Sequence, residues 1–211
     1  MAGKIVPIVE GDGEVTAVPV LLHRLLRESN ALGFQVATPK NAHGSGNLTK
    51  EGGVEKFVRY AWIEPGCAAV IIIIDGDATD CAMTLAKNLA ARIRKLKGPK
   101  PVAVVVANRE YEAWFLASLP SIVGKQIAEA VKLPERLVLS GHPENVRNVK
   151  GWITRHLPSG KAYKETEHQL SMTRLIDLGL ARNASRSFQR LYNAVAQLLT
   201  AVSANSPIVT P

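Results

Sequence analysis

Residues 67–77 read Cys-Ala-Ala-Val-Ile-Ile-Ile-Ile-Asp-Gly-Asp, and this stretch decides the fold. Its four consecutive isoleucines are apolar on both faces of an extended chain. Such a run is typical of a central parallel strand that helices cover on both sides. The run ends at Asp75, and Gly76 permits a tight turn there. We therefore predict a buried strand over 68–74 with two carboxylates, Asp75 and Asp77, at its carboxyl end.

Three further strands and three helices are predicted around this one. The strands are expected at 4–9, 34–38 and 102–107, and the helices at 15–29, 54–63 and 80–96. The resulting β-α-β-α-β-α-β order is the pattern of a doubly wound, mainly parallel sheet. The fold class is therefore α/β. The polar, glycine-rich stretch 39–53 between two of these elements is expected to be a mobile loop.

The second half of the chain is expected to be mostly helical. Helices are predicted at 110–119, 121–131, 144–156, 167–178 and 185–202. The last has a continuous apolar stripe at helical spacing, and the tail after Ser203 is expected to be frayed. We predict an α/β domain at 1–120 and a helical C-terminal extension at 121–211 that packs on it, the two forming one structural unit.

Composition limits the function classes that the chain can belong to. Its formal net charge of +8 suits an anionic partner such as nucleic acid, although a solvated basic surface explains the charge equally well. The longest strongly apolar run, 67–74, is too short to cross a bilayer, so no membrane partner is expected. No signal peptide is expected either. Cys67 and Cys81 match no metal-ligand spacing and suggest a reducing cytoplasm. The absence of a Gly-x-x-x-x-Gly-Lys-Ser/Thr motif excludes a P-loop ATPase.

Acidic residues follow two of the predicted strands directly. Glu10 ends the first strand, and Asp75 with Asp77 ends the isoleucine strand. Because ligands bind at the carboxyl ends of strands in a doubly wound sheet, these acids should share one edge. Carboxylate oxygens suit Mg²⁺, which usually keeps water and substrate phosphate as its other ligands. The alternative is that Glu10 only decorates a turn and that the two aspartates form a capping turn before the next helix.

Here the motifs resemble a known family. Ile8-Val9-Glu10-Gly11 followed by Glu14, and then Ile-Ile-Asp75-Gly-Asp77, resembles the Toprim domain of topoisomerases, primases and overcoming-lysogenization-defect nucleases. Downstream motifs resemble a bacterial Toprim-like family of unassigned function, and this resemblance covers nearly the whole chain. They are Asn-Arg-Glu-Tyr-Glu-Ala-Trp-Phe at 108–115, Lys-Gly-Trp-Ile at 150–153, Tyr-Lys-Glu-Thr at 163–166 and Ser-Arg-Ser-Phe at 185–188.

The resemblance implies roles for individual residues. It implies that Glu10 acts as general acid or base and that Asp75 and Asp77 bind magnesium. Glu14 corresponds to the second acid of a Glu-x-x-x-Glu pattern in nucleases that are implied to hold two metals. Family members are associated with defence against phages and mobile elements, sometimes beside an ATPase partner. The compact helical half does not match a topoisomerase or primase body, so neither of those activities is implied.

A third acidic segment follows the fourth predicted strand. Arg109, Glu110 and Glu112 should lie at the same edge of the sheet, where Arg109 could contact nucleic acid. Two residues apart, the two glutamates cannot share a helical face, so one of them at most faces the metals. Glu112 is favoured because the Glu-Ala-Trp core resembles the family. The alternative is a solvated first helical turn whose acids suit the helix dipole.

Basic residues supply candidates for binding phosphate. Lys40 in the glycine-rich stretch and Lys150 near Trp152 are candidate nucleic-acid contacts, since cations and aromatic rings together suit phosphate contact and base stacking. Lys164 is the candidate cation near the scissile phosphate. Simple solvation of these side chains is the alternative.

The sequence favours a Mg²⁺-dependent nuclease, a hydrolase of DNA or RNA phosphodiester bonds that could also use Mn²⁺. Two other classes stay open. One is a non-catalytic Toprim-like module that binds nucleic acid or regulates an ATPase partner. The other is a nucleotide-binding or nucleotidyl-transfer enzyme. The substitution Asp75→Ala separates the nuclease from the non-catalytic module, because it would abolish turnover by the nuclease but would leave binding by the module intact.

Overall fold

The structure, a computed structural model, describes residues 3–76 and 81–211. Its centre is a sheet with the strand order β2-β1-β4-β5-β8, and β3 pairs with the end of β1. Every pairing in this sheet is parallel, which confirms the predicted sheet type. The strands are β1 (Lys4–Val9), β2 (Gln35–Val36), β3 (Lys40–Asn41), β4 (Cys67–Asp75), β5 (Val102–Ala107) and β8 (Val209–Thr210).

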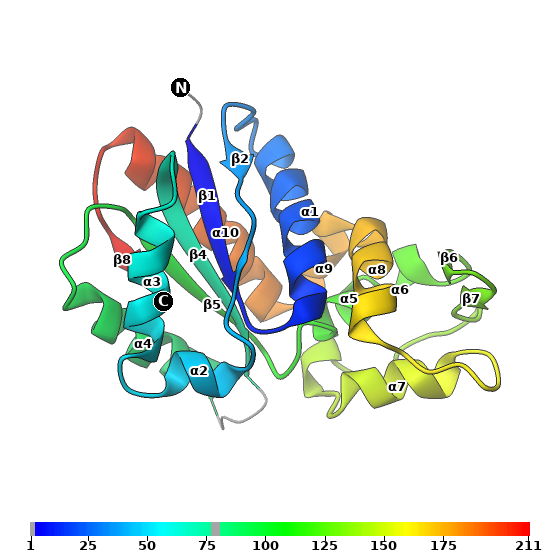
Figure 1. The fold of residues 1–211 in the computed structure, drawn as a ribbon. Coiled ribbons are helices and arrows are strands. Elements are labelled where there is room, and N and C mark those ends of the chain that lie inside the picture. The colour runs from blue at the N-terminus through cyan, green and yellow to red at the C-terminus, as the bar shows by residue number, and fades with distance from the viewer. Residues whose placement is uncertain (1–2, 77–80) are drawn as a thin grey trace.

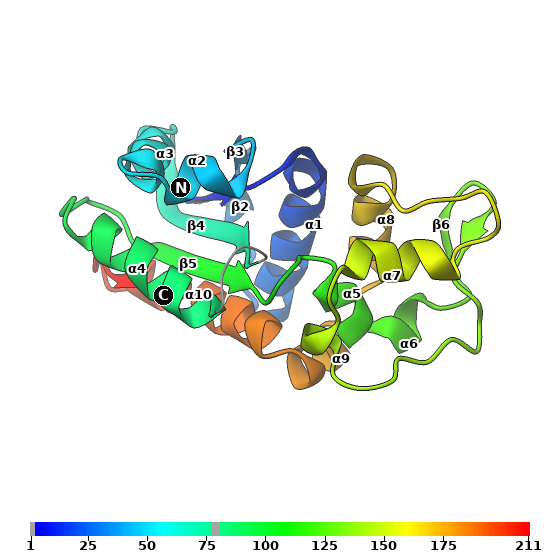
Figure 2. The same ribbon diagram turned by 90° about the horizontal axis from the view of Figure 1, so that it is seen from below.

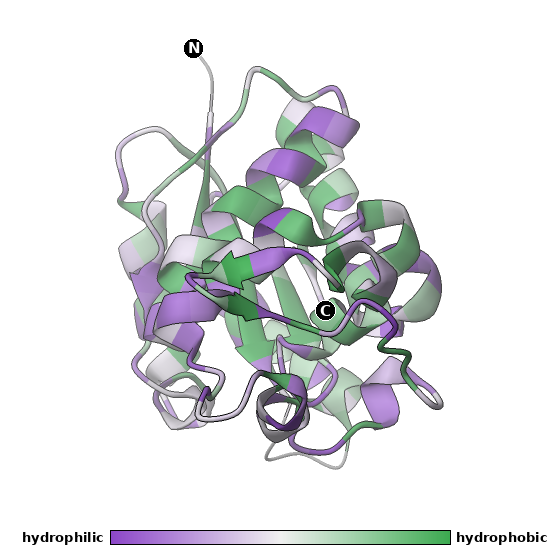
Figure 3. Cartoon of the chain, turned by 90° about the vertical axis from the view of Figure 1, so that its right-hand side faces the viewer, coloured by the Kyte–Doolittle hydropathy of each residue, from purple (hydrophilic) through white to green (hydrophobic). Residues whose placement is uncertain are grey.

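Helices cover both faces of this sheet (Figure 1, Figure 2). One face packs against α1 (Asp12–Glu28) and α10 (Arg186–Ser203), and the other against α3 (Gly53–Trp62) and α4 (Ala82–Arg94). A hydrophobic core lies on each face of the sheet, and the isoleucines of β4 alternate between the two. Ile71 and Ile73 pack in the core with α1 and α10, whereas Ile72 and Ile74 pack in the core with α3 and α4. Each of the four is at most 1% exposed, so each contributes about 1.5–3 kcal/mol of burial free energy. Figure 3 shows the strands as the hydrophobic centre of the molecule.

The strand order places a topological switch beside β1. The chain first adds β2 on one side of β1 and then adds β4 on the other side. In open α/β sheets, ligands bind outside the carboxyl ends of the strands at such a switch point. A ligand site is therefore expected at the loops that follow β1 and β4.

The elements between β5 and α10 form a second layer beside α1 (Figure 2). They are α5 (Ala113–Ala117), α6 (Leu119–Ile122), the antiparallel pair β6 (Gln126–Ala128) and β7 (Val131–Lys132), a 3₁₀ turn η1 (Pro143–Asn145), α7 (Val149–His156), a π-helical segment η2 (Glu165–Gln169), α8 (Leu170–Leu175) and α9 (Leu178–Ala184). The helix predicted at 121–131 is wrong. Gly124 takes a left-handed conformation with φ +71°, which ends α6 and starts a short hairpin.

The C-terminal part returns to the sheet. Helix α10 begins one residue after its predicted start, and Phe188 on it packs edge-on against Trp114 with 5.5 Å between ring centroids. The tail predicted to be frayed instead forms β8, because the Val102 amide donates to Ile208 O and Arg94 donates to Val209 O. The two predicted parts thus share one core. The boundary near residue 120 stays a prediction.

The stretch 39–53 was predicted to be a mobile loop, and this is wrong. It contains β3 and the helix α2 (Ser45–Thr49), and Leu48 on that helix is fully buried. The Arg92 guanidinium on α4 donates to the carbonyl oxygens of Thr49 and Lys50, both at 2.7 Å. A buried leucine and an arginine clamp therefore hold a segment whose composition indicates a loop. Within the described residues, no helix is long and apolar enough to span a membrane.

Candidate functional site: a carboxylate pocket

A pocket of about 420 Å³ lies at the carboxyl ends of β1 and β4. These are the two strands that flank the topological switch. The opposite wall of the pocket is formed by Lys150 on α7 and by Glu165 and Thr166 on η2. The side chains with ionisable groups that line it are those of Glu10, Asp12, Glu14, His43, Asp75, Lys150 and Glu165. Acids thus outnumber cations at this site on a protein that is basic overall.

The sheet register brings Glu10 and Asp75 together. Ile8 on β1 lies opposite Ile72 on β4, so the two acids leave adjacent strands at nearly the same level. The Asp75 amide donates to Glu10 Oε2 at 3.1 Å. Gly76 follows with its amide donating to Ala107 O at 3.0 Å. A side chain at Gly76 would approach that carbonyl within 2.9 Å, so the close contact with the end of β5 requires glycine.

Glu14 lies in the first turn of α1 and folds back over its start. Its Oε2 accepts from the Gly11 amide at 2.6 Å, which satisfies one of the unpaired donors at the helix N-terminus. Glu14 is buried, with only 7% of its surface exposed. Desolvation and the neighbouring charges of Glu10 and Glu165 raise the pKa of Glu14, against the lowering effect of the Gly11 hydrogen bond. Glu14 is therefore held next to other acids at an electrostatic cost.

Asp75 is the most perturbed acid of the pocket. Its Oδ1 accepts from the Tyr111 amide at 2.8 Å, and the residue is 9% exposed. Burial raises the pKa of Asp75 well above its ordinary value, and the charges of Glu112, Glu14 and Glu10 raise it further. Buried acids that repel one another in this way mark sites where a cation or a proton is part of the function.

Glu112 lies behind the pocket and is completely buried. Its Oε1 accepts from Tyr163 Oη at 2.8 Å and from Gln169 Nε2 at 3.2 Å. Its Oε2 has no hydrogen-bond partner within the described residues and lies 4.0 Å from Lys150 Nζ. Desolvation raises the pKa of Glu112, although the Lys150 charge opposes this shift. A buried carboxylate oxygen without a hydrogen bond is costly, so a donor or a cation that bound to Glu112 Oε2 would stabilise it.

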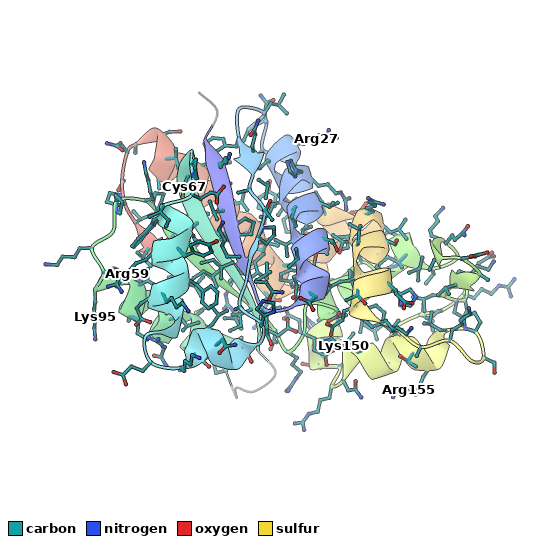
Figure 4. All side chains as sticks on the ribbon, viewed as in Figure 1. Arg27, Arg59, Cys67, Lys95, Lys150 and Arg155 are labelled. Atoms are coloured by element: carbon teal, nitrogen blue, oxygen red, sulfur yellow. The ribbon has the colours of Figure 1, made fainter. Side chains whose placement is uncertain are left out.

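Lys150 contributes an ammonium group to the pocket lining. It lies on α7 at the lower right of Figure 4, about one-third exposed, and forms an ion pair with Glu165. Desolvation acts to lower the pKa of Lys150, but the charges of Glu112, Glu165 and Asp75 outweigh it and raise the pKa. The side chain is therefore cationic at neutral pH and faces the acids directly.

Glu110 sets the position of α7 and hence of Lys150. Its two carboxylate oxygens accept from the Val149 amide at 3.0 Å and from the Lys150 amide at 3.2 Å, while the Asn148 side chain caps Gly151. Sequence reasoning missed this role, because a carboxylate that caps a helix about 40 residues away leaves no local spacing signal. Glu110 and Glu112 thus point to different partners, as their spacing of two predicts.

The π-helical segment η2 closes the pocket against α1. A side chain at Gly13 would collide with Gln169 Oε1 and would reach Glu165 Cβ at 2.9 Å, so α1 and η2 approach closely only because position 13 is glycine. Single π-helical turns occur frequently at functional sites. Here the segment supplies Glu165 and Thr166 to the pocket wall and Gln169 to Glu112.

Three other predicted residues lie outside the pocket lining. Lys40 Nζ bonds Glu64 at 2.7 Å and lies over the Tyr60 ring. Lys164 is exposed and pairs with Glu167 at 2.8 Å. Arg109 has a left-handed backbone with φ +71°, and its Nε is buried without a partner among the described residues. Their functional roles stay predictions. Asp77 lies outside the described residues.

The donors suit a hard cation, although the described part of the chain contains no group of three His, Cys, Asp or Glu side chains placed to hold a metal ion. Mg²⁺ needs fewer protein ligands than that, because one or two carboxylates with water and substrate phosphate complete its octahedron. Glu10, Glu14 and Asp75 offer oxygen donors in one pocket. Burial raises the pKa values of Glu14 and Asp75, and neighbouring negative charges, which a cation would offset, raise them further.

A family model and a solved structure match the chain. No curated protein matches the sequence significantly. Among solved structures, the C-terminal region of the Burkholderia pseudomallei OLD protein is similar, with 17% sequence identity, a TM-score of 0.47 and coverage of 96% of this chain and 99% of that chain. A family model described as "Domain of unknown function (DUF4276)" matches residues 9–196. The chain therefore belongs to this family, as the prediction of a family of unassigned function anticipated.

Proposed function

We propose that the protein is a Mg²⁺-dependent phosphodiesterase that cleaves DNA or RNA. The observation that carries this proposal is the pocket itself, where Glu10, Glu14 and Asp75 meet at the switch point of the sheet opposite a cationic Lys150. An acidic pocket on a protein of net charge +8 suits an anionic substrate only if a cation screens the acids. Mg²⁺, or Mn²⁺ in its place, fits that requirement.

Asp75 is the described residue that would hold the ion, with Glu14 beside it and Asp77 implied by the family resemblance. Glu112 is the candidate for supporting them or for holding a second ion. When bound, the metal supplies Lewis-acid stabilisation of the phosphate charge that develops during cleavage.

The chain's own groups have separate tasks in this proposal. Glu10 is partly exposed in the pocket and serves as general acid or base toward the attacking or leaving oxygen. Lys150 stabilises negative charge on the phosphate from the opposite wall, at a position fixed by Glu110. This assigns to Lys150 the catalytic role that the sequence suggested for Lys164, because Lys150 lines the pocket.

A second candidate function is a non-catalytic module that binds nucleic acid or regulates an ATPase partner. The observation that favours it is the ion pair between Lys150 and Glu165, in which an acid of the pocket wall already pairs with the ammonium group that would otherwise contact a phosphate. Such a module would bind its partner without turnover. A role in defence against phages or mobile elements, beside an ATPase partner, rests on the family resemblance and completes the proposal. The cytoplasmic location that we propose rests on the two cysteines of the sequence.

The direct test is cleavage of labelled single- and double-stranded DNA and RNA in Mg²⁺, Mn²⁺ or EDTA. Asp75→Asn and Glu10→Gln should each reduce metal-dependent cleavage at least 100-fold, the order of loss expected for removing a group that acts in the transition state. Asn at 75 can still accept the Tyr111 hydrogen bond, so the fold should persist. Cleavage that persists in EDTA, or that both variants retain, would refute the proposed activity, whereas binding that survives Asp75→Asn without any cleavage would favour the module.

A further inference from the structure

A second groove adjoins the carboxylate pocket. Its volume is about 400 Å³, and His43 lines both cavities. On the far side of His43 the groove is formed by α2, by the turn after it and by the first turn of α3. Figure 1 shows α2 on one side of the carboxyl ends of the strands and α7 on the other, so the groove extends the pocket in the direction away from Lys150.

The walls of this groove are held in place by specific contacts. Arg92 donates to the carbonyl oxygens of Thr49 and Lys50 and pairs with both oxygens of Glu55, at 2.9 Å and 2.6 Å. Asn47 donates to Ala42 O at 2.9 Å and to His43 O at 3.0 Å, which fixes the chain where the two cavities meet. The groove is thus preorganised, which lowers the entropic cost of binding a ligand.

Its surface has the chemistry that a nucleotide chain requires. Lys50 and Lys56 are exposed at the groove, and Glu51 is the acid beside them. Lys50 Nζ contacts Asn47 Oδ1 at 2.7 Å, and no carboxylate in the described part of the chain forms an ion pair with either lysine. Phe57 is partly buried and adds an apolar surface to the polar walls.

We infer that this groove binds the part of a single nucleic-acid strand that adjoins the scissile phosphate. Lys50 and Lys56 contact its backbone phosphates, and Phe57 contacts a base or sugar. The inference rests on the proposed function and deepens it, since it names the direction in which the strand leaves the pocket. The acidic centre then lies between cations on both sides, Lys150 on α7 and the two lysines at α2 and α3.

Binding can be measured separately from cleavage. The probe is a 5′-fluorescein-labelled dodecathymidylate, whose anisotropy is followed in Mg²⁺ on a Glu10→Gln background and again in EDTA, over a range of NaCl concentrations. The test variant is Lys50→Gln/Lys56→Gln. The matched control is Lys95→Gln/Lys97→Gln, which removes the same charge from two exposed lysines that precede β5 at the opposite edge of the sheet.

The test pair should weaken binding about tenfold and reduce the salt slope of log K by about 1.4, the value expected for two lost single-strand phosphate contacts. The control should change affinity less than about twofold. Phe57→Leu keeps an apolar side chain but removes the ring face, and should weaken binding about fivefold. Circular dichroism verifies that each variant is folded.

Three results would overturn the inference. They are wild-type affinity in the test pair, an equal loss in the test and control pairs, and no binding of the probe by the Glu10→Gln parent protein in either buffer. Loss of cleavage in Asp75→Asn together with unchanged binding in Lys50→Gln/Lys56→Gln would refute the groove and leave the proposed activity standing. The reverse pattern, a tenfold binding loss in a protein that never cleaves, would retain the groove and refute the nuclease.

Discussion

The buried carboxylate of Glu144 and the buried carboxylates of the pocket region have pKa values shifted in opposite directions. Glu144 is 4% exposed, and its Oε1 accepts from Ser185 Oγ at 2.8 Å and from the Ser187 amide at 2.7 Å. Desolvation opposes its ionisation, but these hydrogen bonds prevail and lower the pKa of Glu144. For Asp75 in the carboxylate pocket and Glu112 behind it, burial and the charges of neighbouring acids instead raise the pKa values.

The difference separates an acid with a structural role from acids that we propose to be functional. The hydrogen bonds to Glu144 join η1 to the start of α10, so its charge is satisfied within the fold. Glu112 Oε2 has no hydrogen-bond partner among the described residues, and Asp75 lies among other acids. An arrangement of this kind lowers stability unless something else binds, and such sites are where catalysis and ligand binding occur.

The largest expected effect is on stability at the structural acid. Glu144→Ala should lower the unfolding free energy by about 2–3 kcal/mol, because it leaves the Ser185 hydroxyl and the Ser187 amide without their buried acceptor. Urea denaturation at pH 7 measures this. Since the folded-state pKa of Glu144 is lowered, its contribution is present above the unfolded pKa and is lost as the pH falls through the folded value. A variant as stable as the parent would remove the contrast.

The next effect compares two lysines in cleavage. Lys150→Gln should reduce the rate about 100-fold, because it removes the cation that faces the pocket acids. Lys164→Gln should change the rate less than about threefold, since its ammonium is exposed and pairs with Glu167. Single-turnover rates on the same substrate decide between them. A larger loss at Lys164 would support the role that the sequence suggested for that residue.

A smaller effect of opposite sign is expected at the functional acid. Without metal, Asp75→Asn should raise the unfolding free energy by about 1 kcal/mol at pH 7, because it removes a buried charge among like charges. The folded-state pKa of Asp75 is raised, so the folded protein binds more protons than the unfolded chain above pH ~4, and the parent loses stability as the pH rises through that window. The gain of the variant over the parent should therefore grow from pH 4 to pH 7. A variant less stable than the parent at pH 7 in EDTA would contradict this reading.

The smallest effect concerns the position of Lys150. Glu110→Gln keeps one acceptor for the start of α7 and should lower stability by about 0.5–1 kcal/mol, within the range for a weakened helix cap. Its cleavage rate should fall about threefold, and Glu110→Asp should recover part of that loss. Equal rates for the parent protein and Glu110→Gln would show that the cap is structural only.

The first half of the fold could be predicted because its signals are local. The isoleucine run 71–74 required burial on both faces, and its residues alternate between the two cores as expected. The errors occur where tertiary contacts override composition. Arg92 and buried Leu48 order the stretch predicted as a loop, Gly124 ends a predicted helix, and pairing with β5 orders the tail.

The candidate site could be predicted in part for the same reason. Glu10 and Asp75 follow strands directly, so the topology alone places them at one edge, and the structure brings both into one pocket with Glu14 and Lys150. The capping by Glu110 and the closure by η2 could not be predicted, since both depend on contacts between segments far apart in the sequence.

Thermal unfolding during a Mg²⁺ titration tests most directly whether the pocket acids bind a metal ion. In our proposal the fold keeps these mutually repelling acids together because a metal ion offsets their charge. At 10 mM Mg²⁺ and a dissociation constant near 1 mM, linkage predicts a gain of about 1.4 kcal/mol, or roughly 3–6 °C in Tm for a chain of this size. We predict this saturable rise in the wild-type protein, and none in Asp75→Asn, whose Tm in EDTA should already exceed that of the wild type. An equal rise in both proteins, or no rise in either, would contradict it.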